Sequence, residues 1–248
     1  MLVGVGLALL GSRFYGSEPP TYGGRDGAPL VLGGDRPAGL EPLPDDPRVL
    51  IFGDSYTAAE GAEASAGYAQ RIGDLMGWSD VRVDGMGWSG FLNAGEDGRS
   101  SFLDRLKALD AGDDFDLVIV QGGSDDEDVP GDRTLARSVG KFVRLAERQF
   151  PSAQLVLLTP VSLDTAASDD IRRITDTLIG YGVKHGVPVI SPSREIWFST
   201  SDREALVNDA VDRPNAAGYD QMARRLAERL SALLDPDVAE DTEATAVG

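Results

Sequence analysis

A serine that follows an apolar run is the first residue in this chain whose type and position suggest chemistry. The segment reads Ile51-Phe52-Gly53-Asp54-Ser55-Tyr56-Thr57. A serine between a strand and a helix N-terminus exposes its hydroxyl, and its backbone N–H is free to meet an oxyanion. Gly-Asp-Ser tripeptides also form ordinary turns and helix caps. The segment alone therefore fits either a nucleophile or a turn.

A serine nucleophile needs a base within hydrogen-bond reach, because its hydroxyl reacts poorly at neutral pH. The chain has one histidine, His185, in the sequence Lys184-His185-Gly186 between a helical pattern and a strand pattern. Two cations before a glycine are typical of a helix C-terminus. The carboxyl end of the strand that begins there lies more than ~10 Å away. We therefore expect His185 to cap a helix and not to activate Ser55.

Five short β-type runs alternate with helical patterns from Arg48 onward, which predicts an α/β protein with a parallel sheet. The runs are Arg48–Phe52, Val81–Asp84, Leu117–Gln121, Leu155–Thr159 and Val187–Ile190. Ligands bind such sheets beyond the carboxyl ends of the strands. The loops after the first three strands and the loop into the last helix should therefore form the site.

Apolar spacing marks two of the helices and the limits of one domain. One helix follows a Ser168 N-cap, with apolar residues at Ile171, Ile174 and Leu178; the last helix carries Tyr219, Met222, Leu226, Leu230 and Leu233. We expect an apolar stub and a Gly- and Pro-rich arm over 1–47, one domain over 48–234, and an acidic mobile tail over 235–248.

Charge and composition exclude several classes of partner. The formal net charge of −18 makes the surface repel nucleic acid and anionic lipid. The absence of cysteine removes disulfides, thiolate chemistry and cysteine zinc sites. The apolar segment Leu2–Leu10 is too short to span a bilayer and resembles the end of a truncated signal peptide or anchor. We expect an extracytoplasmic protein that meets a membrane only through such an anchor.

Four segments, in order and on the expected elements, resemble the signature blocks of the SGNH (GDSL-type) hydrolase family. They are the Ser55 segment, Gly85-Met86-Gly87-Trp88-Ser89-Gly90-Phe91, Gln121-Gly122-Gly123-Ser124-Asp125-Asp126-Glu127 and Asp212-Arg213-Pro214-Asn215-Ala216-Ala217-Gly218-Tyr219. The resemblance implies the three-layer α/β/α, flavodoxin-like SGNH-hydrolase fold with a five-stranded parallel sheet in the order 2-1-3-4-5. It also implies a serine esterase for an acyl ester, such as an acylated saccharide or lipid, that needs no cofactor and no metal.

The same resemblance puts the nucleophile at Ser55 and an oxyanion-hole N–H at Gly90, and it shows three departures. Asp125 stands where the family has asparagine, Arg213 where it has histidine, and Ala210 where it has the orienting acid. Arginine has no acceptor lone pair and cannot be the base. An ionised aspartate gives the oxyanion no donor, and losing one donor costs on the order of 10²–10³ in rate. We expect weak ester hydrolysis or none.

Three alternatives stay open from the residues alone. One is a carboxylate base at Asp209 or Asp212, or a protonated Asp125 that donates a hydrogen bond. Another is a non-catalytic pseudoenzyme, with Arg213 binding a carboxylate or phosphate group. The third is a Mg²⁺ or Ca²⁺ site formed by Asp54 and the acidic segment 125–127, against the plainer interpretation of a solvated acidic loop. A nucleotide site is disfavoured because the loop after the first strand lacks Gly-x-Gly-x-x-Gly.

Overall fold

Five strands and five longer helices make up the domain in the computed structural model, which describes residues 40–95, 98, 100–128 and 131–235. The strands are β1 (Arg48–Gly53), β2 (Asp80–Gly85), β3 (Leu117–Gln121), β4 (Gln154–Leu158) and β5 (Val189–Ile190). The longer helices are α1 (Tyr68–Met76), α2 (Phe102–Ala108), α3 (Asp132–Gln149), α4 (Asp169–His185) and α6 (Ala216–Leu234). Short elements are the 3₁₀ turns η1 (Ala64–Ala66), η2 (Ser124–Asp126) and η3 (Thr200–Asp202), the helix α5 (Arg203–Leu206), and the hairpin strands β6 (Val207–Asn208) and β7 (Arg213–Pro214).

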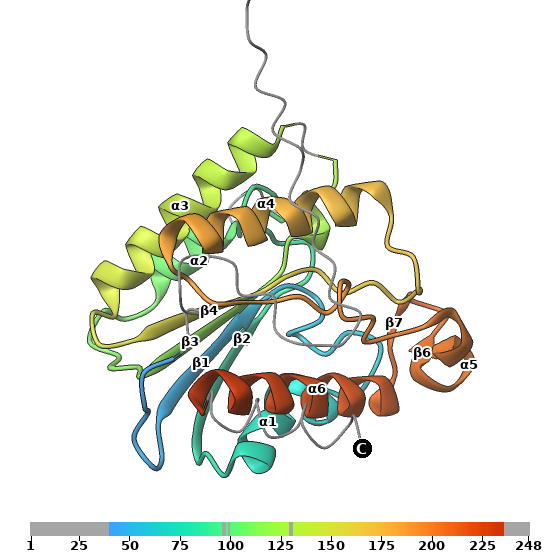
Figure 1. Ribbon diagram of the computed structural model, residues 1–248, viewed down its shortest axis with the longest axis horizontal. Helices are drawn as coiled ribbons and strands as arrows, with labels where there is room; N and C mark the ends of the chain where they lie inside the picture. Colours follow the sequence, from blue (N-terminus) through green and yellow to red (C-terminus); the bar gives the residue numbers. More distant parts are fainter. Residues whose placement is uncertain (1–39, 96–97, 99, 129–130, 236–248) are drawn as a thin grey trace, which may run out of the picture.

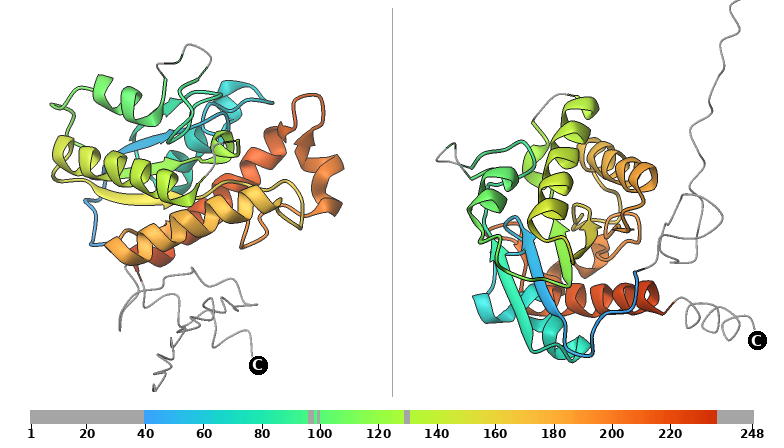
Figure 2. Two further views of the ribbon diagram at one scale, coloured as in Figure 1. Left: turned by 90° about the horizontal axis from the view of Figure 1, so that it is seen from above. Right: turned by 90° about the vertical axis from the view of Figure 1, so that its left-hand side faces the viewer.

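The five strands are parallel and form one sheet in the order β2-β1-β3-β4-β5 (Figure 1). Helices α1 and α6 cover one face of this sheet, and α2, α3 and α4 cover the other (Figure 2). The predicted three-layer α/β/α fold and strand order are therefore confirmed. The strand order reverses at β1, so the loops after β1, β2 and β3 meet at one edge.

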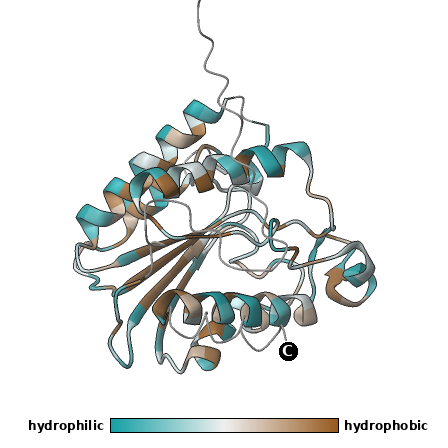
Figure 3. Ribbon diagram, viewed as in Figure 1, coloured by the Kyte–Doolittle hydropathy of each residue, from teal (hydrophilic) through white to brown (hydrophobic). Residues whose placement is uncertain are grey.

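Alternating residues of β1 point into the two helix layers. Val49 and Ile51 belong to the core under α1 and α6, whereas Leu50 and Phe52 belong to the core under α2, α3 and α4. Burial on both faces explains why the strand is apolar throughout. Figure 3 shows the same arrangement, with hydrophobic strands between helices whose outer faces are hydrophilic.

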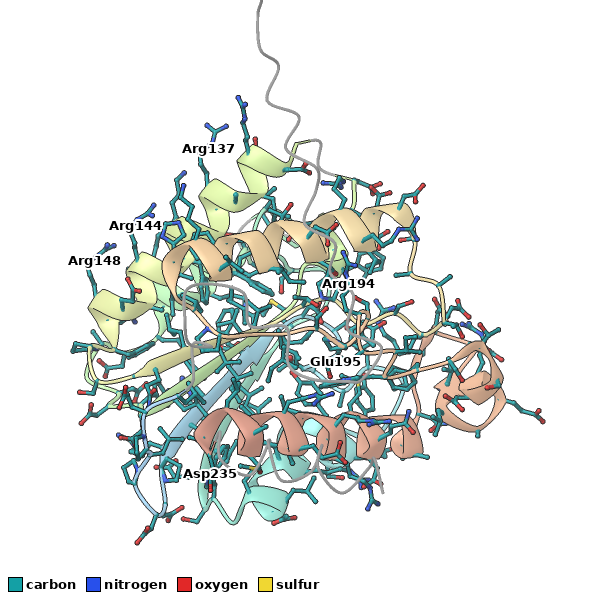
Figure 4. All side chains as sticks on the ribbon, viewed as in Figure 1. Arg137, Arg144, Arg148, Arg194, Glu195 and Asp235 are labelled. Carbon is teal, nitrogen blue, oxygen red and sulfur yellow. The ribbon has the colours of Figure 1, made fainter. Side chains whose placement is uncertain are left out.

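Helix α3 shows how a helix is fitted to this sheet. Its residues Leu135 and Val139 are buried, while Arg137, Arg144 and Arg148 project away from the sheet (Figure 4). Apolar and charged residues on opposite sides of a helix are the pattern expected for a surface helix. These three arginines thus lie on the outer surface of α3.

Two predicted boundaries differ from the structure by two residues or more. The last strand begins at Val189 and not at Val187, and Pro188 has no N–H with which to extend the ladder. Leu40 is buried in the core, and its N–H donates to the carbonyl of Leu233 at 2.9 Å. Leu40, which the sequence pattern assigned to the arm, therefore packs against the core of the domain. The predictions for residues 1–39 and 236–248 lie outside the described residues.

Two further observations concern the predicted histidine and the predicted anchor. His185 ends α4 and stacks on Tyr181 with ring centroids 4.3 Å apart, and Gly186 caps the helix with a φ of 69°. The structural role predicted for His185 is thus confirmed. Among the residues that the structure describes, no helix is both long and apolar enough to cross a bilayer.

Gly85→Ala should destabilise the protein, because the new Cβ would lie 2.3 Å from the backbone nitrogen of Ala58 and 2.4 Å from the carbonyl carbon of Thr57. Backbone atoms cannot turn aside, and overpacking of this kind costs about 1–3 kcal/mol. Gly180→Ala is the matched control. Gly180 lies on the exposed face of α4, where the new Cβ would meet nothing within 4 Å. Alanine inside a helix should raise the free energy of unfolding by about 0.5–1 kcal/mol. Urea unfolding measures both, and equal midpoints would contradict the close approach at Gly85.

Candidate active site

Ser55 lies just beyond β1, and the side chain of Arg213 reaches it from β7. Arg213 Nε donates a hydrogen bond to Ser55 Oγ at 2.9 Å, and the Ser55 residue is only 1% exposed. The first and last signature blocks, 158 residues apart, therefore meet as the resemblance implied. In this contact, however, the serine oxygen accepts a hydrogen bond from a cation, and no side chain among the described residues is bonded to the serine as a base.

Arg213 is fixed by two further contacts. Its guanidinium carbon lies 5.1 Å from the centroid of the Tyr56 ring, and Nη1 donates to the carbonyl of Asp212 at 2.9 Å. A Cβ on Gly61 would lie 2.8 Å from the Cβ of Arg213, so the loop after β1 approaches the arginine closely. The guanidinium is thus held in place beside Ser55.

Asp54 forms a buried polar network behind the serine. Its carboxyl oxygens accept the N–H of Tyr56 at 2.9 Å and the side-chain amide of Gln121 at 3.2 Å. Gln121 in turn accepts the hydroxyl of Thr57 at 2.9 Å. The pKa of Asp54 is raised to about 8, mainly by burial and also by the charge of Asp125, while the hydrogen bonds from Tyr56 and Gln121 and the charge of Arg213 oppose the shift. Asp54 therefore keeps its proton at neutral pH.

Asp125 faces the same site from η2. Burial raises the pKa of Asp125 to about 6, while the charge of Arg213 acts to lower it. Its Oδ2 is buried and has no hydrogen-bond partner within the described residues. Below about pH 6 this carboxyl is largely protonated, and its O–H group can donate a hydrogen bond. At neutral pH it is mostly ionised.

Gly90 lies in a turn that the next acid, Asp126, holds in place. The Asp126 carboxyl accepts the backbone N–H groups of Phe91, Leu92 and Asn93, each at 2.9 Å. A Cβ on Gly90 would come within 2.4 Å of Asp126 Oδ1, which explains the glycine. The Gly90 N–H donates to the carbonyl of Asn93 at 3.0 Å. Its predicted role in an oxyanion hole, which stays a prediction, requires that bond to be shared or released.

The two acids considered as alternative bases are paired with an arginine. Arg203 Nε donates to Asp209 Oδ1 at 2.9 Å, and Arg203 Nη2 donates to Asp212 Oδ1. Among the described residues, Ser55 Oγ has its side-chain hydrogen bond with Arg213 and with neither aspartate. In this structure both carboxylates are bonded to Arg203, and a role for either as the base stays a prediction.

A pocket of about 570 Å³ opens over this group of residues. It is lined by Tyr56, Trp88, Asn93, Ser124, Asp125, Glu127, Asp128, Val161, Ser162, Leu163, Asp164, Ala166, Ser168, Ile171, Arg203, Asp212 and Arg213. Sequence reasoning missed Trp88 and Arg203. Trp88 stands in the second signature block and is 62% exposed, so an aromatic residue among glycines at the binding edge was the available signal. No comparable signal pointed to Arg203.

The predicted cation site gains no support from the geometry. Within the described ranges, no group of three or more histidine, aspartate or glutamate side chains is placed to hold a metal ion. The Asp126 oxygens accept backbone N–H groups, and those of Asp54 accept Tyr56 and Gln121. The carboxyl oxygens of Asp54 and Asp126 thus accept hydrogen bonds from the protein's own N–H groups, which takes up positions that a cation would need.

Asp54→Asn should remove a dependence of stability on pH. The unfolded chain releases the Asp54 proton near the ordinary pKa of 3.8, and the folded protein holds it to about 8. The bound proton therefore stabilises the fold fully at acid pH, and this contribution is lost as pH rises through that interval, by about 1.4 kcal/mol per unit at most. Asparagine mimics the neutral acid once the side-chain amide of Gln121 flips, so that its oxygen accepts from the new N–H group. Urea unfolding from pH 5 to 9 should show the variant gaining stability relative to wild type as pH rises, and a constant difference would contradict the raised pKa.

Comparisons with known proteins agree with this geometry. The GDSL-like Lipase/Acylhydrolase family model matches residues 51–237. The chain is 28% identical over 214 residues to the GDSL lipase Rv0518 of Mycobacterium tuberculosis, covering 82% of this chain and 91% of that protein.

Solved structures share the fold at low sequence identity. A family 2 carbohydrate esterase from Corynascus thermopiles has a TM-score of 0.62 and 18% identity, over 78% of this chain and 68% of that one. A member of the lipolytic protein G-D-S-L family from Veillonella parvula has a TM-score of 0.57 and 15% identity, over 74% and 98% of the two chains. With the family model matching three quarters of the sequence and the four blocks meeting at one edge, the chain belongs to the GDSL-like lipase/acylhydrolase family.

Proposed function

We propose that this member of the family is a ligand-binding protein with little or no ester hydrolysis. The observation that carries the proposal is the hydrogen bond from Arg213 Nε to Ser55 Oγ at 2.9 Å. It occupies the place where a hydrolase of this family needs a proton acceptor. The fold and the pocket are retained, while the group that would activate the serine is replaced by a donor.

The direction of that hydrogen bond opposes nucleophilic attack. A guanidinium carries only N–H donors and stays protonated, so it cannot take the Ser55 proton. The donated bond also engages a lone pair on the oxygen that would attack a carbonyl. Since the serine is 1% exposed, a substrate would have to displace Arg213 from its contacts with Tyr56 and Asp212 before reaching it.

Stabilisation of an oxyanion is weak for related reasons. The Gly90 N–H is engaged with the carbonyl of Asn93. Asp125, with a pKa of about 6, is mostly ionised at neutral pH and repels negative charge. Each missing donor costs on the order of 10²–10³ in rate. Both the proton transfer and the charge stabilisation of acyl transfer are thereby impaired.

The lining of the pocket favours a neutral polar ligand over a phosphate. Five acidic residues, Asp125, Glu127, Asp128, Asp164 and Asp212, line it with two arginines. Arg203 is engaged with the acids around it. A phosphate or carboxylate would meet net negative charge, whereas the acyl oxygen of a neutral ester can still accept from Arg213. An acylated saccharide, the ligand class implied by the family resemblance, fits this balance.

Wild-type protein should resist labelling by a fluorophosphonate probe, because the probe reports an activated serine. Turnover of p-nitrophenyl acetate should match that of Ser55→Ala within about tenfold, the residual coming from groups other than the serine. Gel fluorescence measures the labelling, and the absorbance of released p-nitrophenolate measures the turnover. Strong labelling that Ser55→Ala abolishes would refute the proposal and make this chain a serine esterase.

Restoring the family's residues should restore hydrolysis. Asp125→Asn supplies an oxyanion donor, Arg213→His a base, and Ala210→Asp its orienting acid. Because triad residues act as a unit, single changes should give little, while the triple variant should gain about 10³-fold or more. The same triple variant with Ser55→Ala is the control. A folded triple variant that labels and turns over no better than wild type would mean that the site has been rebuilt beyond its missing triad.

A further inference from the structure

We infer that Arg105 is a positioning residue that sets one wall of the pocket by holding the loop of residues 86–93. This loop follows β2 and carries Trp88 and Asn93, both of which line the pocket. Arg105 holds this wall in the same way whether the pocket hydrolyses a ligand or only binds it.

Arg105 is a buried cation that joins three segments. It projects from α2 and is 8% exposed. Nη1 donates to the carbonyl of Gly53 at 2.9 Å and to Ser89 Oγ at 2.7 Å. Nη2 donates to the carbonyl of Asp84 at 2.6 Å and to its carboxylate at 2.5 Å. One guanidinium thus binds the end of β1, the end of β2 and the 86–93 loop.

The packing around Arg105 fixes the plane of this guanidinium. Its central carbon lies 4.3 Å from the centroid of the Phe52 ring and 5.6 Å from that of Phe102. A buried charge is tolerated when it is paired and hydrogen-bonded, and an aromatic face adds a cation–π contact. Lysine offers a point charge without the planar fork. Only arginine can reach these four acceptors from this position on α2.

The 86–93 loop is held at two points by buried groups of opposite charge. Ser89 accepts from Arg105 and donates to the carbonyl of Met86 at 2.6 Å. Beyond Gly90, the carboxyl of Asp126 accepts the three N–H groups of Phe91–Asn93. Trp88 lies next to the first of these points, and the turn at Gly90 lies between the two.

The backbone of Trp88 shows that the loop needs such support. Its φ is 57°, in the left-handed region that residues with a side chain rarely adopt. Strained backbone of this kind persists only when neighbouring contacts determine it. One such contact is the hydrogen bond from Arg105 Nη1 to Ser89 Oγ, beside the bond from Ser89 to Met86 and the bridge between Ser89 and Ala94. Loss of the bond to Arg105 should let Trp88 leave this conformation and change the pocket wall.

Arg105 also relates this loop to Ser55. The Gly53 carbonyl, two residues before the serine, accepts both Arg105 Nη1 and the N–H of Met86, the latter at 3.1 Å. The carbonyl oxygen of Gly53 therefore connects the loop that carries Ser55 with the start of the 86–93 loop. A change at Arg105 should alter the spacing of these two loops as well as the stability of the domain.

Ser89→Ala tests the inference, because it removes one acceptor of Arg105 and leaves the bonds to β1 and β2. Hydrogen exchange followed by mass spectrometry should show amides of 86–93 exchanging about tenfold faster, the factor expected for a lost hydrogen bond near 1.4 kcal/mol. Amides of β3 and α6 should not change. Ser168→Ala is the matched control. It removes the N-cap of α4, which is not one of the three segments that Arg105 joins, and should lower the unfolding midpoint without selective exchange in 86–93.

Trp88 supplies an independent optical readout. The other two tryptophans, Trp78 and Trp197, are 9% and 2% exposed, so acrylamide quenching reports mainly on Trp88. Ser89→Ala and Arg105→Lys should each change this quenching, and the double variant should add little to Arg105→Lys. Should Arg105→Lys fail to fold, Ser89→Ala decides alone. Unchanged exchange in 86–93, or a uniform increase across the domain, would overturn the positioning role and leave Arg105 as a purely structural residue.

Discussion

The burial of β1 on both faces is the constraint from which the site follows. Its residues from Val49 to Gly53 are buried, so the strand has no place for a polar side chain along its length. Polar groups can begin only where the strand ends, and there Asp54 and Ser55 follow at once. Because the sheet is parallel and its order reverses at β1, the polar residues after β2 and β3 collect at the same place. The hydrophobic requirement of the core thereby fixes the position of the chemistry.

Three carboxyl groups at this edge show how strongly local surroundings decide the character of one residue type. Asp54 is sealed in the core and keeps its proton. Burial raises the pKa of Asp125 to about 6, against the charge of Arg213, which acts to lower it. Burial raises the pKa of Asp126 as well, and three backbone N–H groups oppose the shift. The carboxyl groups that suggested a cation site therefore have separate roles. Asp54 is buried and protonated, Asp125 lines the pocket, and Asp126 holds the 86–93 loop.

Much of the fold could be predicted because it rests on local patterns. Apolar runs marked five strands to within about two residues, and Ser168 and the spacing after it marked α4. Arg213 was placed beside Ser55 by the order of the four blocks. What sequence reasoning missed depends on contacts between distant segments. Arg105 resembles a surface residue of a helix, and only the packed structure shows that it is buried.

The hairpin of β6 and β7 escaped prediction for a similar reason. Each strand has two residues, too few for any alternation of apolar and polar residues to be visible. The pairing of Asn208 with Arg213 is nevertheless what presents the arginine to the serine. Short pairings of this kind are specified by the segments around them, and they carry no periodic signal of their own.

The contact between Leu40 and Leu233 joins the first described segment of the domain to its last helix. The entering segment also exchanges two hydrogen bonds between Glu41 and Gln154 at the start of β4, at the edge of the sheet opposite the pocket. The first and last described segments of the chain therefore brace one another. Fraying cannot proceed from one end alone, because release of either segment exposes apolar surface of the other. The beginning and the end of this domain should open together, as one cooperative unit.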